Sequence, residues 1–170
     1  MKHPPFLRAL ACTCVLAVGA CGFQPRAEVA IPANLGPVKV AVSDPYSPLG
    51  DAIARGLTRG GAQPAAATDT QVATLRIVSE EWNEGPVSVD AFSHVREDVV
   101  TYTVKFTMTS ATNATIAPVQ VAKLQRNYVY DDAHALGTSQ EQATIHEELQ
   151  RDMAATILRR IGIALRNFKA

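Results

Sequence analysis

"VVTYTVKFTMT", residues 99–109, is the stretch that decides the fold of this chain. Apolar side chains occupy every second position and alternate with hydroxyl or charged side chains; the apolar set is Val100, Tyr102, Val104, Phe106 and Met108, and the polar set is Thr101, Thr103, Lys105, Thr107 and Thr109. Successive side chains of a strand point to opposite faces, so this alternation predicts a long β-strand. One face is expected to be buried, and the other is solvated or meets a partner.

Weaker strand patterns lie on both sides of this segment. Residues 38–42 alternate valine with other residues, and a second strand is expected within residues 72–82. Residues 110–118 predict a turn, which leads to a further strand at 119–130 in the same meander. Small residues at 62–70, just before the second strand, are expected to form a linker.

A helix is predicted between the first two strands. Ser47 can cap its amino end, Pro48 suits the first helical position, and Gly60 and Gly61 are expected to end it. Apolar residues recur at a spacing of four in this segment, at Leu49, Ile53 and Leu57. This spacing predicts one buried stripe.

The last element is expected to be a longer helix. Ser139 and Gln142 match a capping box, and one apolar stripe follows: Ile145, Leu149, Met153, Ile157, Ile161 and Leu165. At 1.5 Å per residue this helix would span about 40 Å. The order of the elements predicts an α+β fold, a mostly antiparallel four-stranded sheet with two helices packed on one face.

The amino terminus has the layout of an export signal. Lys2 and Arg8 form a basic head, residues 9–20 are apolar, and small residues stand before Cys21. The apolar run is shorter than the roughly 20 residues that a membrane-spanning helix needs. Residues 18–21, "VGAC", resemble the bacterial lipobox, which implies that the Cys21 thiol carries lipid and anchors the chain in a membrane. The alternative is a plain signal that happens to contain this cysteine.

These signals divide the chain into three parts. Residues 1–20 are expected to be a lipoprotein signal peptide, residues 21–37 a lipidated terminus and tether, and residues 38–170 a single domain. Removal of residues 1–20 takes away two basic residues, which leaves 14 basic against 16 acidic residues and a formal charge of −2. This balance does not favour nucleic-acid binding, for which a basic face is expected.

Catalytic patterns are not found in the sequence. His94, His134 and His146 do not have the spacing of metal ligands, and no nucleophile elbow or phosphate loop occurs. Glu80 and Glu81 are adjacent on a predicted strand, so they point to opposite faces and are interpreted as surface charges. We therefore expect no enzyme activity, no catalytic residues, no metal site and no cofactor.

Three segments resemble the LptE family of lipopolysaccharide-assembly lipoproteins. They are "CGFQPR" at 21–26, "SDPYSPLGDAIARGL" at 43–57 and "RNYVYDDAHALGTSQEQATIHEELQRDMAATILRRIG" at 126–162. In the last, an aromatic strand end passes through an acidic turn into a helix that starts rich in Gln and Glu and closes on an arginine pair. Together with the strands between them, the match extends over nearly all of the mature chain.

The resemblance implies an outer-membrane lipoprotein that plugs the lumen of the LptD β-barrel, helps it to assemble and binds lipopolysaccharide, and that is not an enzyme. Gly22 fits outer-membrane delivery, because retention in the inner membrane calls for Asp after the lipidated cysteine. A barrel lumen is polar, so the side chains suited to face it are Thr101, Thr103, Lys105, Thr107 and Thr109. Their alternative role is that of an ordinary solvated face.

Lipopolysaccharide binding would need cations for the phosphates of that lipid. Arg96, Lys123 and Arg126 are the candidates, and plain surface charge is the alternative for each. Two rival functions stay open: an accessory lipoprotein of another envelope lipid-transport system, and a small periplasmic hydrolase.

Overall fold

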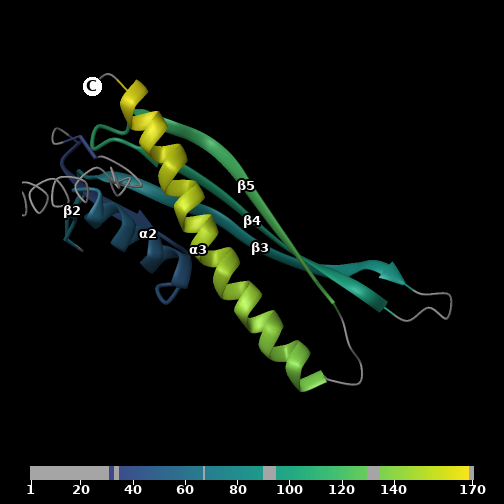
Figure 1. Ribbon diagram of the computed structural model, residues 1–170. Helices are drawn as coiled ribbons and strands as arrows, with labels where there is room; N and C mark the ends of the chain where they lie inside the picture. Colours follow the sequence, from purple (N-terminus) through teal and green to yellow (C-terminus); the bar gives the residue numbers. More distant parts are fainter. Residues whose placement is uncertain (1–30, 33–34, 67, 90–94, 130–134, 169–170) are drawn as a thin grey trace, which may run out of the picture.

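The fold is one five-stranded sheet with two helices packed on the same face (Figure 1). A computed structural model describes residues 31–32, 35–66, 68–89, 95–129 and 135–168. The elements are β1 (Pro37–Ala41), α2 (Pro48–Arg59), β2 (Gln63–Pro64), β3 (Ala73–Val89), β4 (Val95–Thr109), β5 (Thr115–Val129) and α3 (Ala135–Asn167). This arrangement confirms the α+β class and the placement of both helices.

The sheet is mixed, which corrects the prediction of four mostly antiparallel strands. Its order is β2-β1-β3-β4-β5; β1 runs parallel to both β2 and β3, whereas β3, β4 and β5 are antiparallel. The chain passes from β1 through α2 to β3, and a helical crossover returns it in the same direction. The fifth strand, β2, is two residues long and contains a proline, so it carries no alternation that could predict it.

Three strands are longer than their patterns predicted. β4 begins at Val95 and not at residue 99. β3 continues past residue 82 to Val89, although Gly85 and Pro86 are typical of a turn, because it stays paired with β4. β5 begins at Thr115 and not at residue 119, and its pairing register with β4 shifts around Pro118. Proline is tolerated at such irregular points of an edge strand.

The core confirms the two strongest patterns of the sequence. The apolar face of β4 is completely buried, at 0% exposure for each of Val100, Tyr102, Val104, Phe106 and Met108. The predicted stripe of α3 packs against it: Ile145, Leu149, Met153, Ile157, Ile161 and Leu165 all belong to the same core cluster. α2 contributes Leu49, Ile53 and Leu57 to this cluster.

The start of α2 is as predicted. The Ser47 hydroxyl accepts a hydrogen bond from the Gly50 amide at 3.2 Å, and Pro48 begins the helix. Gly60 is the residue after its last turn, and Gly61 has a φ of +95°, which favours glycine.

The start of α3 differs from the prediction. The helix begins at Ala135, so Ser139 lies within it and Ser139 and Gln142 do not form a capping box at its start. The Gln142 side chain instead donates to Glu84 on β3. Ala135 and Leu136 are strong helix formers, so the helix extends upstream of the apparent cap. Its 33 residues span about 50 Å at 1.5 Å per residue.

The chain enters the domain before β1. The Ile31 amide donates to the Gly60 carbonyl at 3.0 Å, and Ile31 and Leu35 pack against the core. Residues 1–30 lie outside the described part, and with them the predicted signal and Cys21.

Candidate functional site

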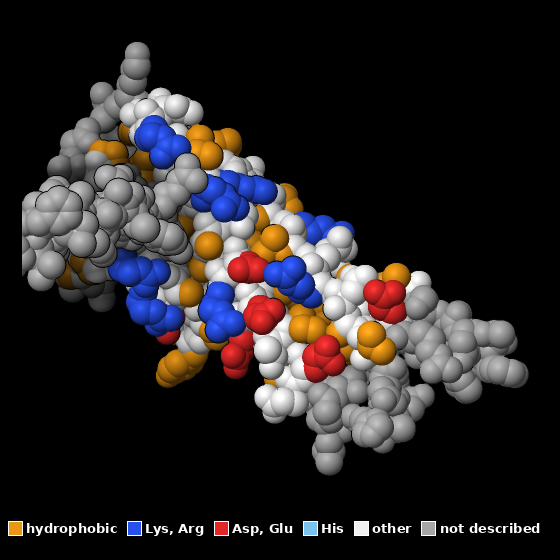
Figure 2. Space-filling model, viewed as in Figure 1, with side chains coloured by type: hydrophobic (Ala, Val, Ile, Leu, Met, Phe, Trp, Pro, Cys, Tyr) orange, Lys and Arg blue, Asp and Glu red, His pale blue; other side chains and the backbone are white. Residues whose placement is uncertain are grey.

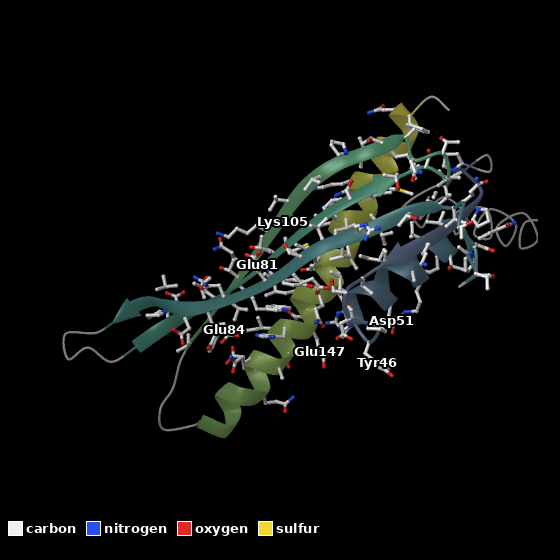
Figure 3. The ribbon with its side chains drawn as sticks, turned by 180° about the vertical axis from the view of Figure 1, so that it is seen from behind. Tyr46, Asp51, Glu81, Glu84, Lys105 and Glu147 are labelled. Atoms are coloured by element: carbon white, nitrogen blue, oxygen red, sulfur yellow. The ribbon has the colours of Figure 1, made fainter. Side chains whose placement is uncertain are left out.

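The polar residues of β4 lie on the face of the sheet that neither helix covers (Figure 3). We call this the threonine face; it contains Thr101, Thr103, Lys105, Thr107 and Thr109, each partly buried between neighbouring strands. Lys105 lies 3.7 Å from Glu81 of β3 in an ion pair. Thr101 accepts a hydrogen bond from the Gln125 side chain of β5 at 3.0 Å. These residues of β4 therefore supply hydroxyl and charged groups that contact polar groups of β3 and β5, and the half-exposed Val121 of β5 lies beside Lys105 on the same face.

The candidate cations of β5 do not gather at one place. Lys123 pairs with Thr103 in the β4–β5 register, so it lies on the threonine face, where it is exposed. Arg126 is three residues away and points to the helix side, where it lies 3.1 Å from Asp152 of α3. The side chain of Arg96 lies outside the described part.

A shift in strand pairing decides which residues of β3 face the helices. Ile77 pairs with Phe106 but Ser79 pairs with Lys105, so Val78 is an additional residue in β3. Before this bulge the odd-numbered residues face the core; after it the even-numbered residues do. Glu80, Trp82 and Glu84 consequently point toward α3.

Trp82 lies between two rings. The Tyr102 ring of β4 stacks on one side, with centroids 3.8 Å apart and an angle of 8°, and His146 of α3 stacks on the other, at 4.3 Å and 2°. These three rings connect the fully buried core to the half-exposed surface of α3.

Glu80 accepts hydrogen bonds from two elements. The Tyr102 hydroxyl donates to one carboxylate oxygen at 2.7 Å, and the Ser47 hydroxyl donates to the other at 3.1 Å. Burial, followed by the hydrogen bond and the negative charge of Glu80, raises the pKa of Tyr102 above its ordinary value. Glu80 and Glu81 lie on opposite faces, as predicted, but Glu80 is a structural acceptor and not only a surface charge.

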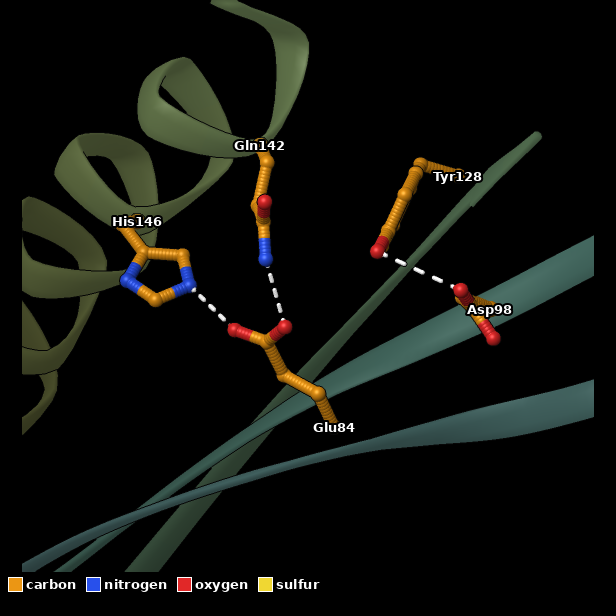
Figure 4. A network of polar contacts seen from close by, with 5 residues as sticks. All are labelled: Glu84, Asp98, Tyr128, Gln142 and His146. Carbon is orange, nitrogen blue, oxygen red and sulfur yellow. Dashed lines mark hydrogen bonds and ion pairs between the residues drawn. The ribbon is translucent and has the colours of Figure 1, made fainter. Parts of the chain in front are cut away.

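Glu84 holds the first half of α3 to the sheet (Figure 4). The His146 Nε2 atom lies 2.7 Å from one oxygen of this carboxylate, and the Gln142 amide donates to the other. On the neighbouring strands, the Tyr128 hydroxyl donates to Asp98 at 3.3 Å. These contacts are polar and partly exposed, and they lie beyond the apolar core.

Sequence reasoning missed this polar and aromatic network. Simple alternation after Leu75 and Ile77 places Ser79 and Glu81 on the core face, and Trp82 outside. The one available signal was a pair of glutamates followed by tryptophan, at positions where a buried strand should carry aliphatic residues.

The described residues contain no group of three or more His, Cys, Asp or Glu side chains that could hold a metal ion. His94 and His134 lie outside the described part. Among the described helices, none combines the length and apolar character needed to cross a membrane.

Comparison with known proteins places these features in a family. The lipopolysaccharide-assembly family LptE matches residues 35–161, which include the whole sheet and most of α3. This chain belongs to the LptE family. The family consists of assembly lipoproteins without enzymatic activity, so the expectation that the chain is not an enzyme is confirmed by its family.

The relatives of this LptE chain can be aligned with it along most of its length. The LPS-assembly lipoprotein LptE of Photorhabdus laumondii is 24% identical over 161 residues, which are 95% of this chain and 87% of the relative. The rare lipoprotein B of Shewanella oneidensis has a similar structure, with a TM-score of 0.68 and 21% identity over 78% of this chain and 98% of that one. A lipoprotein B of Nitrosomonas europaea gives a TM-score of 0.66 and 24% identity, over 83% and 90%.

Proposed function

We propose that this LptE protein is an outer-membrane lipoprotein, lipidated at Cys21, which plugs an LptD-type β-barrel and assists the insertion of lipopolysaccharide at the cell surface. The family match over residues 35–161 carries this proposal. Residues 1–20 act as the signal, residues 21–37 as the lipidated terminus and tether, and residues 38–170 as the plug domain. The lipid holds the chain at the membrane, because several acyl chains on one residue anchor almost permanently.

The threonine face supports docking within a barrel. A barrel lumen is polar, so its partner should present hydroxyl and mixed charged groups and not an apolar surface. The threonine face offers hydroxyls together with the Lys105–Glu81 ion pair, and neither of the described helices, α2 and α3, covers it. Its residues point away from the core, so they can be changed without removing core contacts.

Affinity purification from detergent-solubilised envelopes tests the partner. A tagged wild-type chain should bring down a stoichiometric LptD-type barrel. The double variant Thr103→Arg, Lys105→Glu should reduce this yield about tenfold, which is the effect of roughly 1.4 kcal/mol of lost binding free energy. Thr144→Arg, Arg151→Glu on the exposed side of α3 is the matched control and should leave the yield unchanged. Equal losses in both variants, or capture of an inner-membrane transporter subunit, would contradict the proposal.

Lipopolysaccharide contact is proposed for Arg96, Lys123 and Arg126. Lys123 is exposed on the threonine face, and the Arg126–Asp152 pair is itself exposed, so a phosphate can compete for this arginine. Substitution of each cation by glutamine, with Arg151→Gln as the control, should weaken binding of purified lipopolysaccharide to the detergent-solubilised protein. Binding that is equal in all four variants and wild type would exclude these three side chains as the contact.

A further inference from the structure

Both helices finish at the end of the domain where the chain enters. The carbonyl of Gly60, which follows α2, accepts a hydrogen bond from the Ile31 amide. Gly56, in the last turn of α2, lies against Leu158 in the second half of α3. Figure 1 shows α3 finishing at the same end as α2, far from the opposite end of the β3–β4 pair. We call this the basal end.

Basic and acidic side chains are distributed unevenly along the long axis of the domain. From Met153 to its end at Asn167, α3 contains three arginines (Arg159, Arg160 and Arg166) and no acidic residue. Its described first half contains four acidic residues (Glu141, Glu147, Glu148 and Asp152) and one arginine (Arg151). The strands beside that half carry five acidic residues (Glu80, Glu81, Glu84, Glu97 and Asp98) and the three cations Lys105, Lys123 and Arg126, so acidic residues are in excess there. Figure 2 shows Lys and Arg side chains over the end at which α3 finishes, a mixture of both charges over the middle, and Asp and Glu side chains toward the other end.

Exposed apolar side chains accompany the basal arginines. Ile163 of α3 is 47% exposed, and Val119, which follows Pro118 in the edge strand β5, is 61% exposed. A groove of about 530 Å³ lies between the start of β5 and the end of α3, and Ile116, Ile163 and Phe168 line it. Arg160 also lines the groove and donates to the Val121 carbonyl at 2.8 Å.

This combination of groups fits a lipid surface. Apolar side chains next to arginines are the composition of segments that lie in the headgroup region of anionic membranes. Arg159 and Arg166 are exposed, and Asp69, four residues before β3, already accepts a hydrogen bond from the Ala66 amide at 2.8 Å. The basal end therefore presents positive charge and apolar area to one partner.

The segment between Cys21 and Ile31 is short enough to keep the basal end near a bilayer. Ten peptide units separate Cys21 from Ile31, and a fully extended chain of this length reaches at most about 36 Å. A lipid on Cys21 would thus hold Ile31, and the basal end beside it, within this distance of the membrane. The acidic half would point away from the anionic surface.

We propose that the basal end, with Ile163, Arg159 and Arg166, docks on the surface of a bilayer that contains anionic phospholipid and so fixes the orientation of the domain. This inference rests on the lipidation of Cys21 given under the proposed function. It goes further, because it assigns a second membrane contact to the folded domain itself.

Single-cysteine probes test the contact. Cys12 and Cys14 leave with the signal and an acylated Cys21 cannot react, so a cysteine introduced into the mature lipoprotein is the one reactive thiol. Ile163→Cys places a fluorophore at the basal end. Val87→Cys, which is similarly exposed at 52%, places it at the far end of β3, about 46 Å along the strand from Ala73. Both proteins are reconstituted in vesicles with a lipid-borne quencher, made of phosphatidylcholine alone, with added phosphatidylglycerol, or with added lipopolysaccharide.

We expect strong quenching at residue 163 and little at residue 87, with the contrast increased by phosphatidylglycerol. Arg159→Gln, Arg166→Gln should reduce the affinity of the basal end for the anionic vesicles about tenfold, whereas Arg151→Gln should not. Equal quenching at both positions, or no response to phosphatidylglycerol, overturns the proposal. Quenching at residue 163 that requires vesicles with lipopolysaccharide also overturns it, in favour of that lipid.

Thiol labelling of the wild-type protein distinguishes a failure of the proposed docking from a failure of the proposed lipidation of Cys21. If wild type takes up the thiol label, Cys21 is not acylated and the proposed lipidation fails. The same comparison is then made in a mature Cys21→Ser background at high vesicle concentration, where quenching specific to residue 163 still supports docking and its absence overturns it.

Discussion

Gly56 of α2 lies so close to Leu158 of α3 that a Cβ on residue 56 would overlap the Cδ1 atom of Leu158. Leu158 is 1% exposed, so the leucine has little room to move. The absence of a side chain at residue 56 therefore lets the two helices pack side by side on the sheet.

Gly56→Ala should lower the free energy of unfolding. Overpacking a core costs about 1–3 kcal/mol, and the better helix propensity of alanine offsets up to about 1 kcal/mol of this. We expect a net loss of about 1 kcal/mol or more in urea unfolding. Gly85→Ala is the control, because no atom lies within 4 Å of its new Cβ. A Gly56→Ala protein as stable as wild type would contradict the close packing.

His146→Ala should release the first half of α3 from the sheet. It removes the ring stacked on Trp82 and the hydrogen bond to Glu84, with an expected loss of about 1–2 kcal/mol. Trp82 is the single tryptophan, so its fluorescence reports this contact directly. We expect its emission to shift to longer wavelength, and Thr144→Ala, an exposed change on the same helix, to leave it as in wild type. Unchanged emission in His146→Ala would argue against the stack.

Tyr102 should make stability depend on alkaline pH. Its pKa is raised in the folded protein, so the folded state keeps the proton at a pH where the unfolded chain, with an ordinary pKa of about 10, loses it. Stability from this group is thus complete below about pH 10 and falls as pH rises above that value. Urea unfolding across this range should show a decline that is smaller in Tyr102→Phe. Identical pH slopes in the two proteins would refute the assignment.

Ser47→Ala should destabilise the protein at neutral pH. The hydroxyl caps α2 and also donates to Glu80, and loss of a cap costs about 1 kcal/mol. Ser47→Asp, which keeps the cap but brings a second carboxylate to Glu80, should recover only part of this loss. Thr58→Ala near the end of the same helix is the control and should change the unfolding midpoint little. A larger effect at residue 58 than at residue 47 would contradict the role of the cap.

The parts of the fold that sequence could predict are those with a long uninterrupted period. The alternation in β4 continues over its whole core-facing length, and the apolar stripe of α3 continues over several helical turns. The buried residues follow such long repeats closely. The cap of α2 was also readable, because a serine before a proline is a local signal.

The remaining parts depend on pairing between distant segments. β2 forms because its two residues pair with the edge of β1, and its own sequence has no strand pattern. α3 begins before its apparent cap because good helix formers precede it. The surroundings of Glu80 and Trp82 were missed because a bulge in β3 is a property of two strands together and does not follow from the alternation of either strand alone.

Val78 is thus a spacer. Its own side chain is half exposed, and the bulge takes up this one additional residue so that Ser79 and the residues after it keep their partners on β4. If Val78 were deleted, Ile77 could still pair with Phe106 and Ser79 with Lys105, and regular alternation alone would keep the Trp82 ring facing His146. Among relatives that share about a quarter of their residues with this chain, the length between Ile77 and Ser79 should therefore vary by one residue more readily than the face on which Glu80 and Trp82 lie.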